Sequence, residues 1–231
     1  MTRKGKRNTN TKGVRKLWTV IEEHLIQHAP LIHKSLNSGA TEAQISGFEE
    51  VFGAAIPADL RESLHIHDGQ SWKVPIPTGK IPRPVWFLGG GHLNSVSEMV
   101  AFQSRTYAVL PEVGDAFRGE WPGLKKDSRI RYRDYWCNQW IPLTDSEGDG
   151  FCIDMAPAAQ GVAGQVFYFC RGDHWPRIDG VRPWQVLAPD FTTWLAVHAE
   201  LLEEGRYTIQ FEGRCIRFEP REVLYERLLA I

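Results

Sequence analysis

The fold is decided by residues 140–166, which read WIPLTDSEGDGFCIDMAPAAQGVAGQV. Three runs rich in apolar, β-branched and aromatic residues lie in and around this stretch: Gln139 to Leu143, Phe151 to Met155, and Gln165 to Cys170. Turns rich in Asp, Gly and Pro separate them, and these residues favour chain reversals between strands. The pattern predicts an antiparallel meander of three strands.

Helices are predicted before this meander. Residues 16–29 place apolar side chains at helical spacing on one face, and Pro30 ends the pattern. Thr41 and Gln44 have the spacing of a capping box, and Gly53 suits the left-handed conformation that closes a helix. Pro57 suits the first position of a further helix. The N-terminal third is therefore expected to be helical.

Outside the meander, the pattern of apolar and polar residues is less regular. Val85 to Leu88 reads as a short buried strand, and Ser95 with Glu98 repeats the capping-box spacing. Residues 109–133 show no sustained period and are interpreted as an ordered surface insertion. Asp190 caps a long helix that closes at Gly205, and a hairpin and a short helix follow. Helices, a meander and helices again indicate an α+β fold without βαβ alternation.

Charge is distributed unevenly along the 231 residues. Residues 1–16 contain seven Lys or Arg and no acid, whereas the remainder contains 20 basic and 28 acidic residues. A polar, basic segment cannot bury enough apolar surface to become ordered, so residues 1–16 are predicted to be a flexible tail. Such a tail can touch phosphates non-specifically, but specific recognition of nucleic acid is not expected. The acidic body suits a basic partner.

A cytoplasmic protein is expected. No run of apolar residues is long enough to span a bilayer, and the first residues do not resemble a secretory signal. The four cysteines, Cys137, Cys152, Cys170 and Cys215, are widely spaced among apolar neighbours. This distribution is typical of buried, reduced thiols and not of a disulfide framework.

Catalytic and metal-binding patterns are weak. His65, His67 and Asp68 form the best candidate for a metal site, yet no HExxH or paired CxxC supplies further ligands. The segment GVAGQ at 161–165 lacks the Lys-Ser/Thr of a phosphate-binding loop, and no GxSxG occurs. The sequence therefore predicts neither an enzyme nor a bound cofactor or metal.

Protein binding is the alternative that the residues favour. Trp72, Trp121, Trp136 and Trp175 lie in predicted loops, where exposed aromatic side chains would be typical interface anchors. The turn TDSEGDG carries Asp145, Glu147 and Asp149 and would attract a basic partner. The alternatives are that each Trp is partly buried and that the turn is only solvated.

These elements together resemble the SMI1/KNR4 family of the SUKH superfamily. The resemblance rests on Trp18 with Ile21 and Glu22, on 39–70 (GATEAQISGFEEVFGAAIPADLRESLHIHDGQ), on 140–157, on GVAGQVF at 161–167, and on FTTWL at 191–195. It implies an α+β fold with a central, mainly antiparallel sheet flanked by helices. It implies an SMI1/KNR4-like domain at 17–205, with an insertion near 109–133 and an extension at 206–231.

The resemblance also implies a function without catalytic residues. Bacterial members of the family are immunity proteins that bind and neutralise cognate polymorphic toxins, and fungal members regulate cell-wall glucan synthesis. Because only a short tail flanks the domain here, the expectation is an immunity protein, with a scaffold or regulator of cell-wall or glucan synthesis as the alternative. The expected partner is a protein, a toxin in the first case, and no membrane.

Overall fold

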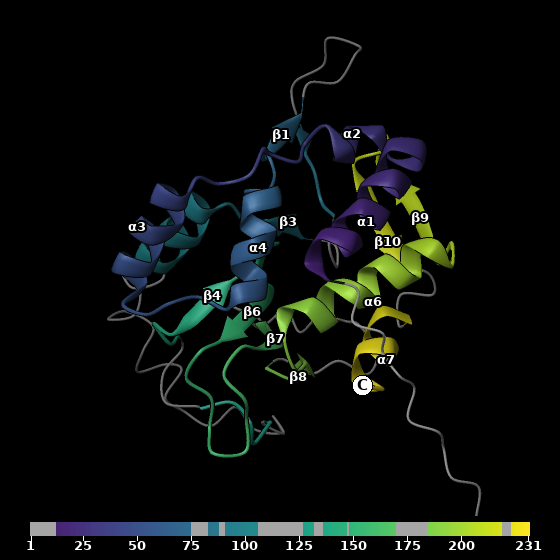
Figure 1. Ribbon diagram of the computed structural model, residues 1–231. Coiled ribbons are helices and arrows are strands. Elements are labelled where there is room, and N and C mark those ends of the chain that lie inside the picture. Colours follow the sequence, from purple (N-terminus) through teal and green to yellow (C-terminus); the bar gives the residue numbers. More distant parts are fainter. Residues whose placement is uncertain are drawn as a thin grey trace, which may run out of the picture.

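A four-stranded antiparallel sheet lies at the centre of the protein, in the order β4-β6-β7-β8. The computed structural model (Figure 1) describes residues 13–74, 83–87, 91–105, 127–131, 136–146, 148–169, 184–218 and 223–231. The strands of the sheet are β4 (Trp140–Pro142), β6 (Gly150–Asp154), β7 (Gln165–Phe169) and β8 (Val186–Ala188). The predicted meander is confirmed, since β4, β6 and β7 pair consecutively.

Shorter strands surround this sheet. Strand β5 (Thr144–Asp145) follows β4 almost directly and pairs antiparallel with β3 (His92–Leu93). Strand β1 (Lys73–Val74) pairs with β2 (Arg83–Pro84), and β9 (Tyr207–Gln210) forms a hairpin with β10 (Cys215–Phe218). The predicted C-terminal hairpin is thus observed.

Helices pack around the sheet. They are α1 (Val14–His28), α2 (Pro30–His33), α3 (Glu42–Phe52), α4 (Ala58–Ile66), α6 (Phe191–Glu203) and α7 (Val223–Leu229), and residues 96–105 are also helical. In Figure 1, α1 lies against α6 and α4, with the β9-β10 hairpin beside them. The fold is therefore the predicted α+β arrangement.

The helix ends follow their local signals. Thr41 and Gln44 form the complete capping box at the start of α3, and Gly53 ends this helix with φ of 78°. Ser95 and Glu98 form the same reciprocal pair before helical residues 96–105, with N···O distances of 2.8 and 3.3 Å. The side chain of Asp190 accepts a hydrogen bond from Thr193 N at the start of α6. Each pair satisfies amides that the helix leaves without intrahelical partners.

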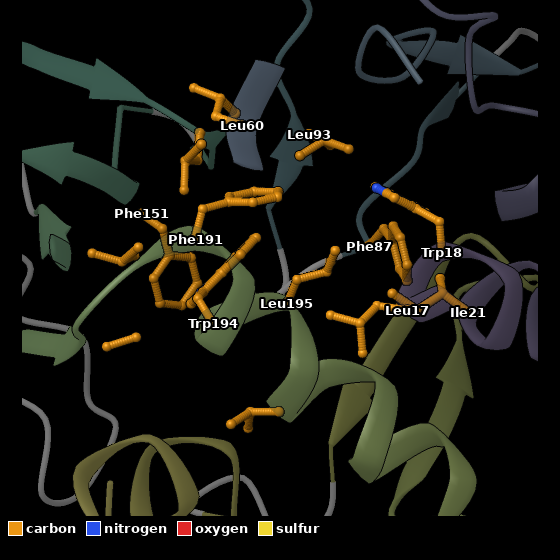
Figure 2. Packing of buried hydrophobic residues seen from close by; sticks show 14 of the residues in the cluster. Leu17, Trp18, Ile21, Leu60, Phe87, Leu93, Phe151, Phe191, Trp194 and Leu195 are labelled. Atoms are coloured by element: carbon orange, nitrogen blue, oxygen red, sulfur yellow. The ribbon is translucent and has the colours of Figure 1, made fainter. Parts of the chain in front are cut away.

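The main core lies between the sheet and the helices. Alternate residues of β6, such as Phe151 and Ile153, face this core. Figure 2 shows Phe151 beside Phe191 and Trp194 of α6, and the packing continues to Trp18 of α1. The indole Nε1 of Trp18 donates to Ser63 Oγ at 2.8 Å, so this fully buried ring keeps its hydrogen bond.

The opposite face of the sheet is buried as well. Cys152, Phe167 and Phe169 point to that face and form a second cluster with Trp136 and Trp140. All five residues of β6 and all five of β7 are therefore buried. Burial on both faces explains why these strands read as almost continuous apolar runs.

One predicted strand is wrong. Val85 and Phe87 are fully buried, as expected for Val85 to Leu88, but the only pairing described there is an isolated parallel bridge between Trp86 and Cys215. Phe87 N donates to Gly91 O at 2.8 Å and not to a neighbouring strand. The apolar side chains of this segment correctly indicated that it is buried, but they did not indicate whether it pairs as a strand.

Several expectations fall outside the described residues. Helix α1 begins at Val14, so only residues 1–12 of the predicted tail remain without a description, as does most of the predicted insertion at 109–133. Within the described ranges no helix is both long and apolar enough to cross a bilayer. Cys152 and Cys215 are buried thiols, as predicted, whereas Cys137 is half-buried, and Cys170 is among the residues without a description.

Candidate functional site

The acidic turn between β5 and β6 is tightly built. Ser146 and Asp149 pair with each other through backbone hydrogen bonds of 2.7 and 3.2 Å. Asp145 accepts a further hydrogen bond from Gly148 N at 2.7 Å, and Gly148 has φ of 102°, a conformation that glycine adopts without strain. Asp145 and Asp149 are half-buried, and Glu147 lies outside the described residues. The turn thus holds at least two carboxylates in a fixed place.

An open cleft of about 250 Å³ lies directly beside this turn. Its walls come from the turn and the main sheet on one side and from β10 and α7 on the other. The residues that line it are Trp86, Gly91, Thr144, Ser146, Gly150, Phe151, Tyr168, Cys215, Ile216, Arg217, Phe218, Leu224 and Tyr225. The cleft therefore joins the central sheet to the C-terminal hairpin and helix.

Three aromatic rings from the sheet and α7 pack together beneath the cleft. Phe151 lies 5.6 Å from Tyr168 and 6.3 Å from Tyr225 between ring centroids. Burial raises the pKa of Tyr225, and burial also raises the pKa of the Cys215 thiol, so both groups stay protonated at neutral pH. Among its lining residues there is no histidine, carboxylate or lysine. Among these described lining residues no nucleophile is therefore paired with a base.

The rim of the cleft combines aromatic and cationic groups. The guanidinium carbon of Arg217 lies 5.8 Å from the ring centroid of Phe211, a cation–π contact. Phe211 is 50% exposed, and its ring meets that of Trp86 edge-on at 6.3 Å. The indole Nε1 of Trp86 is fully buried and has no hydrogen-bond partner among the described residues.

The tip of the β9-β10 hairpin presents Phe211 in an uncommon backbone conformation. Phe211 and Glu212 have φ of 53° and 57°, followed by Gly213 at 79°. Bulky residues seldom adopt this left-handed region, and such outliers often occur at functional positions. The hairpin tip therefore holds an exposed aromatic side chain beside the cleft at some conformational cost.

Of the four predicted tryptophans, Trp72 is exposed and Trp136 is not. Trp72 is 37% exposed, and its ring packs edge-on against the buried ring of His92 at 4.5 Å. His92 of β3 is the register partner of Asp145 of β5, so Trp72 packs against the strand next to the one that leads into the acidic turn. Trp121 and Trp175 lie outside the described residues.

The prediction of Trp136 as an exposed anchor is wrong. Its side chain is only 2% exposed and belongs to the aromatic cluster under the sheet. Its ring lies 5.0 Å from Phe102, 5.0 Å from Phe169 and 5.5 Å from Trp140, measured between centroids. A large aromatic ring in a segment that leads into a core strand covers that strand instead of facing a partner.

The fold does not bring His65, His67 and Asp68 together as metal ligands. His65 contacts Ala40 O and Glu42, whereas His67 contacts Asn37 O and Glu22. Asp68 accepts from Val96 N at 2.7 Å, and burial raises its pKa. Among the residues with a described placement, no three His, Cys, Asp or Glu side chains gather as metal ligands. These residues instead connect α4 to α1, α3 and helical residues 96–105.

The sequence reasoning missed the C-terminal half of the cleft. Arg217, Phe218 and Tyr225 lie in the segment expected to be an extension and line one wall of the cleft, and Phe211 of the same segment contacts Trp86 and Arg217. The available signal was the hairpin YTIQFEGRCIRF, which places a phenylalanine at its turn. An aromatic residue at a position that favours Gly, Asn or Asp indicates a contact that compensates for the poor turn chemistry.

Comparison with known proteins identifies similar sequences. The sequence model of the SMI1 / KNR4 family (SUKH-1) matches residues 39–197. The chain is 28% identical to the "Cell wall biosynthesis/cell cycle regulator smi1" of Schizosaccharomyces pombe, with 89% of this chain and 40% of that protein covered. It is 26% identical to a "Glucan synthesis regulatory protein" of Neurospora crassa, with 83% and 39% covered.

A third relative has a different name. The chain is 25% identical to human "F-box only protein 3", with 85% of this chain and 36% of the relative covered. The chain thus spans about two fifths of the length of the curated relatives it matches. The names of the two fungal relatives are regulatory, and none of the three names an enzyme or a toxin-binding protein.

Proposed function

Because the chain belongs to the SMI1/KNR4 family (SUKH-1), we propose that it is a non-catalytic protein-binding module with a regulatory role. The observation that supports this function best is the open cleft beside the acidic turn, with its aromatic floor and no catalytic pair among its lining residues. A partner would be held there by apolar contact and steered by the acidic body.

Regulation of cell-wall or glucan synthesis is the specific role that we propose. Support comes from the names of the relatives in Schizosaccharomyces pombe and Neurospora crassa. In this role the protein would connect a regulatory protein with a wall-synthesis enzyme instead of acting on a polysaccharide itself. The buried free thiols of Cys152 and Cys215 suit a reducing compartment, and we place the protein in the cytoplasm on that ground.

Affinity purification with cross-linking from the native cell tests protein binding through the cleft. Ser146→Arg places a long cationic side chain in the cleft, and Val51→Arg is the control because Val51 is 64% exposed on α3 and does not line the cleft. We expect the main partners to be recovered with the wild type and the control, and to drop about tenfold with Ser146→Arg. Equal recovery with all three proteins would place binding elsewhere.

A deletion strain tests the specific role. If the protein regulates wall synthesis, loss of the gene should increase sensitivity to wall-perturbing compounds, and the wild-type gene should restore resistance while the Ser146→Arg variant should not. A deletion strain with normal growth under wall stress and normal glucan content would contradict the role in wall synthesis.

Toxin neutralisation is the second candidate function. The excess of acidic over basic residues in the body, 28 against 20, supports it because many toxins that act on nucleic acid are basic. The two candidates differ in their partners. Neutralisation requires one dominant toxic partner and protection from it on coexpression, whereas wall regulation requires several housekeeping partners. Continued killing by each candidate toxin despite verified expression would remove the second candidate.

A further inference from the structure

The described lining of the cleft supplies hydrogen-bond donors and one positive charge. Apart from Trp86, its polar side chains are Thr144, Ser146, Tyr168, Cys215, Arg217 and Tyr225. Hydroxyl groups can donate or accept, whereas a guanidinium can only donate. Burial raises the pKa of Tyr225 and the pKa of Cys215, so both side chains keep a proton to donate at neutral pH. The cleft is therefore matched to an occupant that carries acceptors.

Arg217 places its charge at the wall formed by β10. Its guanidinium carbon lies 5.8 Å from the centroid of the Phe211 ring, and this cation–π contact favours a position beside the cleft. Cys215 is two residues away on the same strand, so both side chains lie on one face of the hairpin. Burial raises the pKa of the Cys215 thiol, and the guanidinium groups of Arg217 and Arg214 oppose this shift. Two cations thus act on this wall.

The turn carboxylate of Asp145 acts on the other face of the sheet. Cys152 of β6 faces away from the cleft, in the second buried cluster. Burial raises the pKa of the Cys152 thiol, and the carboxylates of Asp154 and Asp145 raise it further. The thiol in the cleft wall and the thiol on the opposite face therefore experience charges of opposite sign. Among the described residues, positive charge prevails at the β10 wall.

The rest of the lining suits an apolar side chain. Phe151, Tyr168 and Tyr225 form the aromatic floor, and Ile216 and Leu224 extend it. The volume of about 250 Å³ lies below the ~300–1,000 Å³ that is usual for small-molecule sites, so the cleft has room for a few side chains of a larger partner. Carboxylates are the acceptors that a guanidinium binds most strongly, often through two parallel hydrogen bonds.

We propose that the cleft binds an acidic segment of a partner protein, in which an Asp or Glu side chain pairs with Arg217 and a neighbouring large apolar side chain packs over the aromatic floor. This inference rests on the proposed protein-binding function and specifies the segment that enters the cleft. The net negative charge of the body acts at long range on the partner as a whole, whereas Arg217 acts on the groups that reach the cleft.

A random twelve-residue peptide library displayed on phage, selected on the full chain, is the probe. We expect the selected peptides to share a large apolar residue close to an Asp or Glu. Replacing that acid with Asn or Gln in a synthetic peptide should weaken its binding to the wild-type protein about tenfold, because a hydrogen-bonded charge pair becomes a neutral contact. This comparison changes only the peptide, so it does not depend on the folding of a protein variant.

A double-mutant cycle assigns the effect to Arg217. Arg217→Gln should also weaken the acidic peptide about tenfold, and in this variant the change from acid to amide in the peptide should have little further effect. Arg15→Gln, at an exposed site on the first turn of α1, is the control and should leave both affinities unchanged. Isothermal titration calorimetry measures all of these affinities.

Three results would overturn the proposal. One is that no peptide is selected, and another is that the selected peptides are basic or lack an acid. The third is that the effects of Arg217→Gln and of the change in the peptide simply add, because independent effects mean that the two groups do not touch.

The two proposals fail in different ways. If cellular partners are lost with Ser146→Arg but peptide binding does not depend on Arg217, protein binding through the cleft stands and the acidic segment is wrong. If neither peptides nor cellular partners depend on the cleft, both proposals are wrong.

Discussion

At the scale of single residues, His198 shows how burial creates a pH dependence. This histidine on α6 is completely buried, its Nδ1 donates to Trp194 O at 2.9 Å, and its Nε2 has no hydrogen-bond partner in the part of the chain that the structure describes. Burial disfavours the imidazolium and lowers the pKa of His198 to about 4. The unfolded chain has a His pKa of about 6.5, so between these values the unfolded state binds the extra proton.

The free energy of unfolding should therefore fall as the pH decreases from about 6.5 to 4. For His198 alone the loss between pH 7 and pH 5 is about 2 kcal/mol. Urea unfolding of the wild type and of His198→Gln at both pH values measures this contribution, because the variant cannot titrate at that position. His28→Gln, an exposed site, is the control and should keep the wild-type slope. An unchanged slope in His198→Gln would show that this histidine is not responsible.

Two glycines in different surroundings should respond oppositely to substitution. A Cβ at Gly150 would lie 2.1 Å from Thr144 O, whereas a Cβ at Gly47 on α3 would meet nothing within 4 Å. Gly150→Ala should destabilise the protein by about 1–3 kcal/mol and widen the acidic turn. Gly47→Ala should stabilise it by about 0.5–1 kcal/mol through helix propensity. Denaturant unfolding checks both, and equal effects of the two substitutions would contradict this explanation.

At the scale of elements, Asp59 connects the starts of two helices. Its Oδ2 accepts from Thr192 N and Thr192 Oγ1 at 2.9 and 3.0 Å, and its Oδ1 accepts from Leu60 N at 2.9 Å. The carboxylate thus serves α4 and α6 together. Asp59→Ala should reduce the free energy of unfolding by about 1–3 kcal/mol. Glu62→Ala, an exposed site on the same helix, should change it by less than about 0.5 kcal/mol. Similar losses in both variants would contradict the connecting role.

Helices and strands were predictable from the sequence where the residues that define them lie close together along the chain. The capping pairs Thr41–Gln44 and Ser95–Glu98 lie three residues apart, and both form as expected. The pairing of Trp86 with Cys215 and the packing of Trp136 against Phe169 join distant parts of the chain. No short window of sequence contains such contacts, so a single bridge was interpreted as a strand and a core residue as an interface anchor.

Contacts between distant parts of the chain also explain why only part of the candidate site was predicted. The acidic turn was predicted because Asp and Gly between two strand-like runs are a local signal. The cleft exists only because β10 and α7 return to the face of β6, which brings Tyr225 within 6.3 Å of Phe151. Half of the candidate site was therefore visible in the sequence, and the wall formed by β10 and α7 was not.

At the scale of the whole molecule, the family-matched segment 39–197 shares its core with both flanks. Helix α1, which precedes the segment, buries five residues: Val14, Leu17, Trp18, Ile21 and Leu25. After the segment, Ile216, Tyr225 and Leu228 are buried in the same cluster. At about 2 kcal/mol for each large buried side chain, α1 alone contributes about 10 kcal/mol as an upper estimate. That amount is comparable with the ~5–15 kcal/mol total stability of a typical domain.

The segment 39–197 expressed alone should therefore fail to unfold cooperatively. Without α1, the last six residues of α6 (198–203) and the C-terminal hairpin and helix, the inner face of α4 and the remaining part of α6 would be exposed to water, and we expect a collapsed state that binds hydrophobic dyes. Residues 13–231 are the matched control, because they lack only the 12 residues before Gly13 and keep every described element. Thermal unfolding followed by near-UV circular dichroism should give the control the melting temperature of the full chain and should give the short segment no transition. A cooperative transition of 39–197 near the wild-type temperature would show that both flanks are dispensable attachments to a self-sufficient domain.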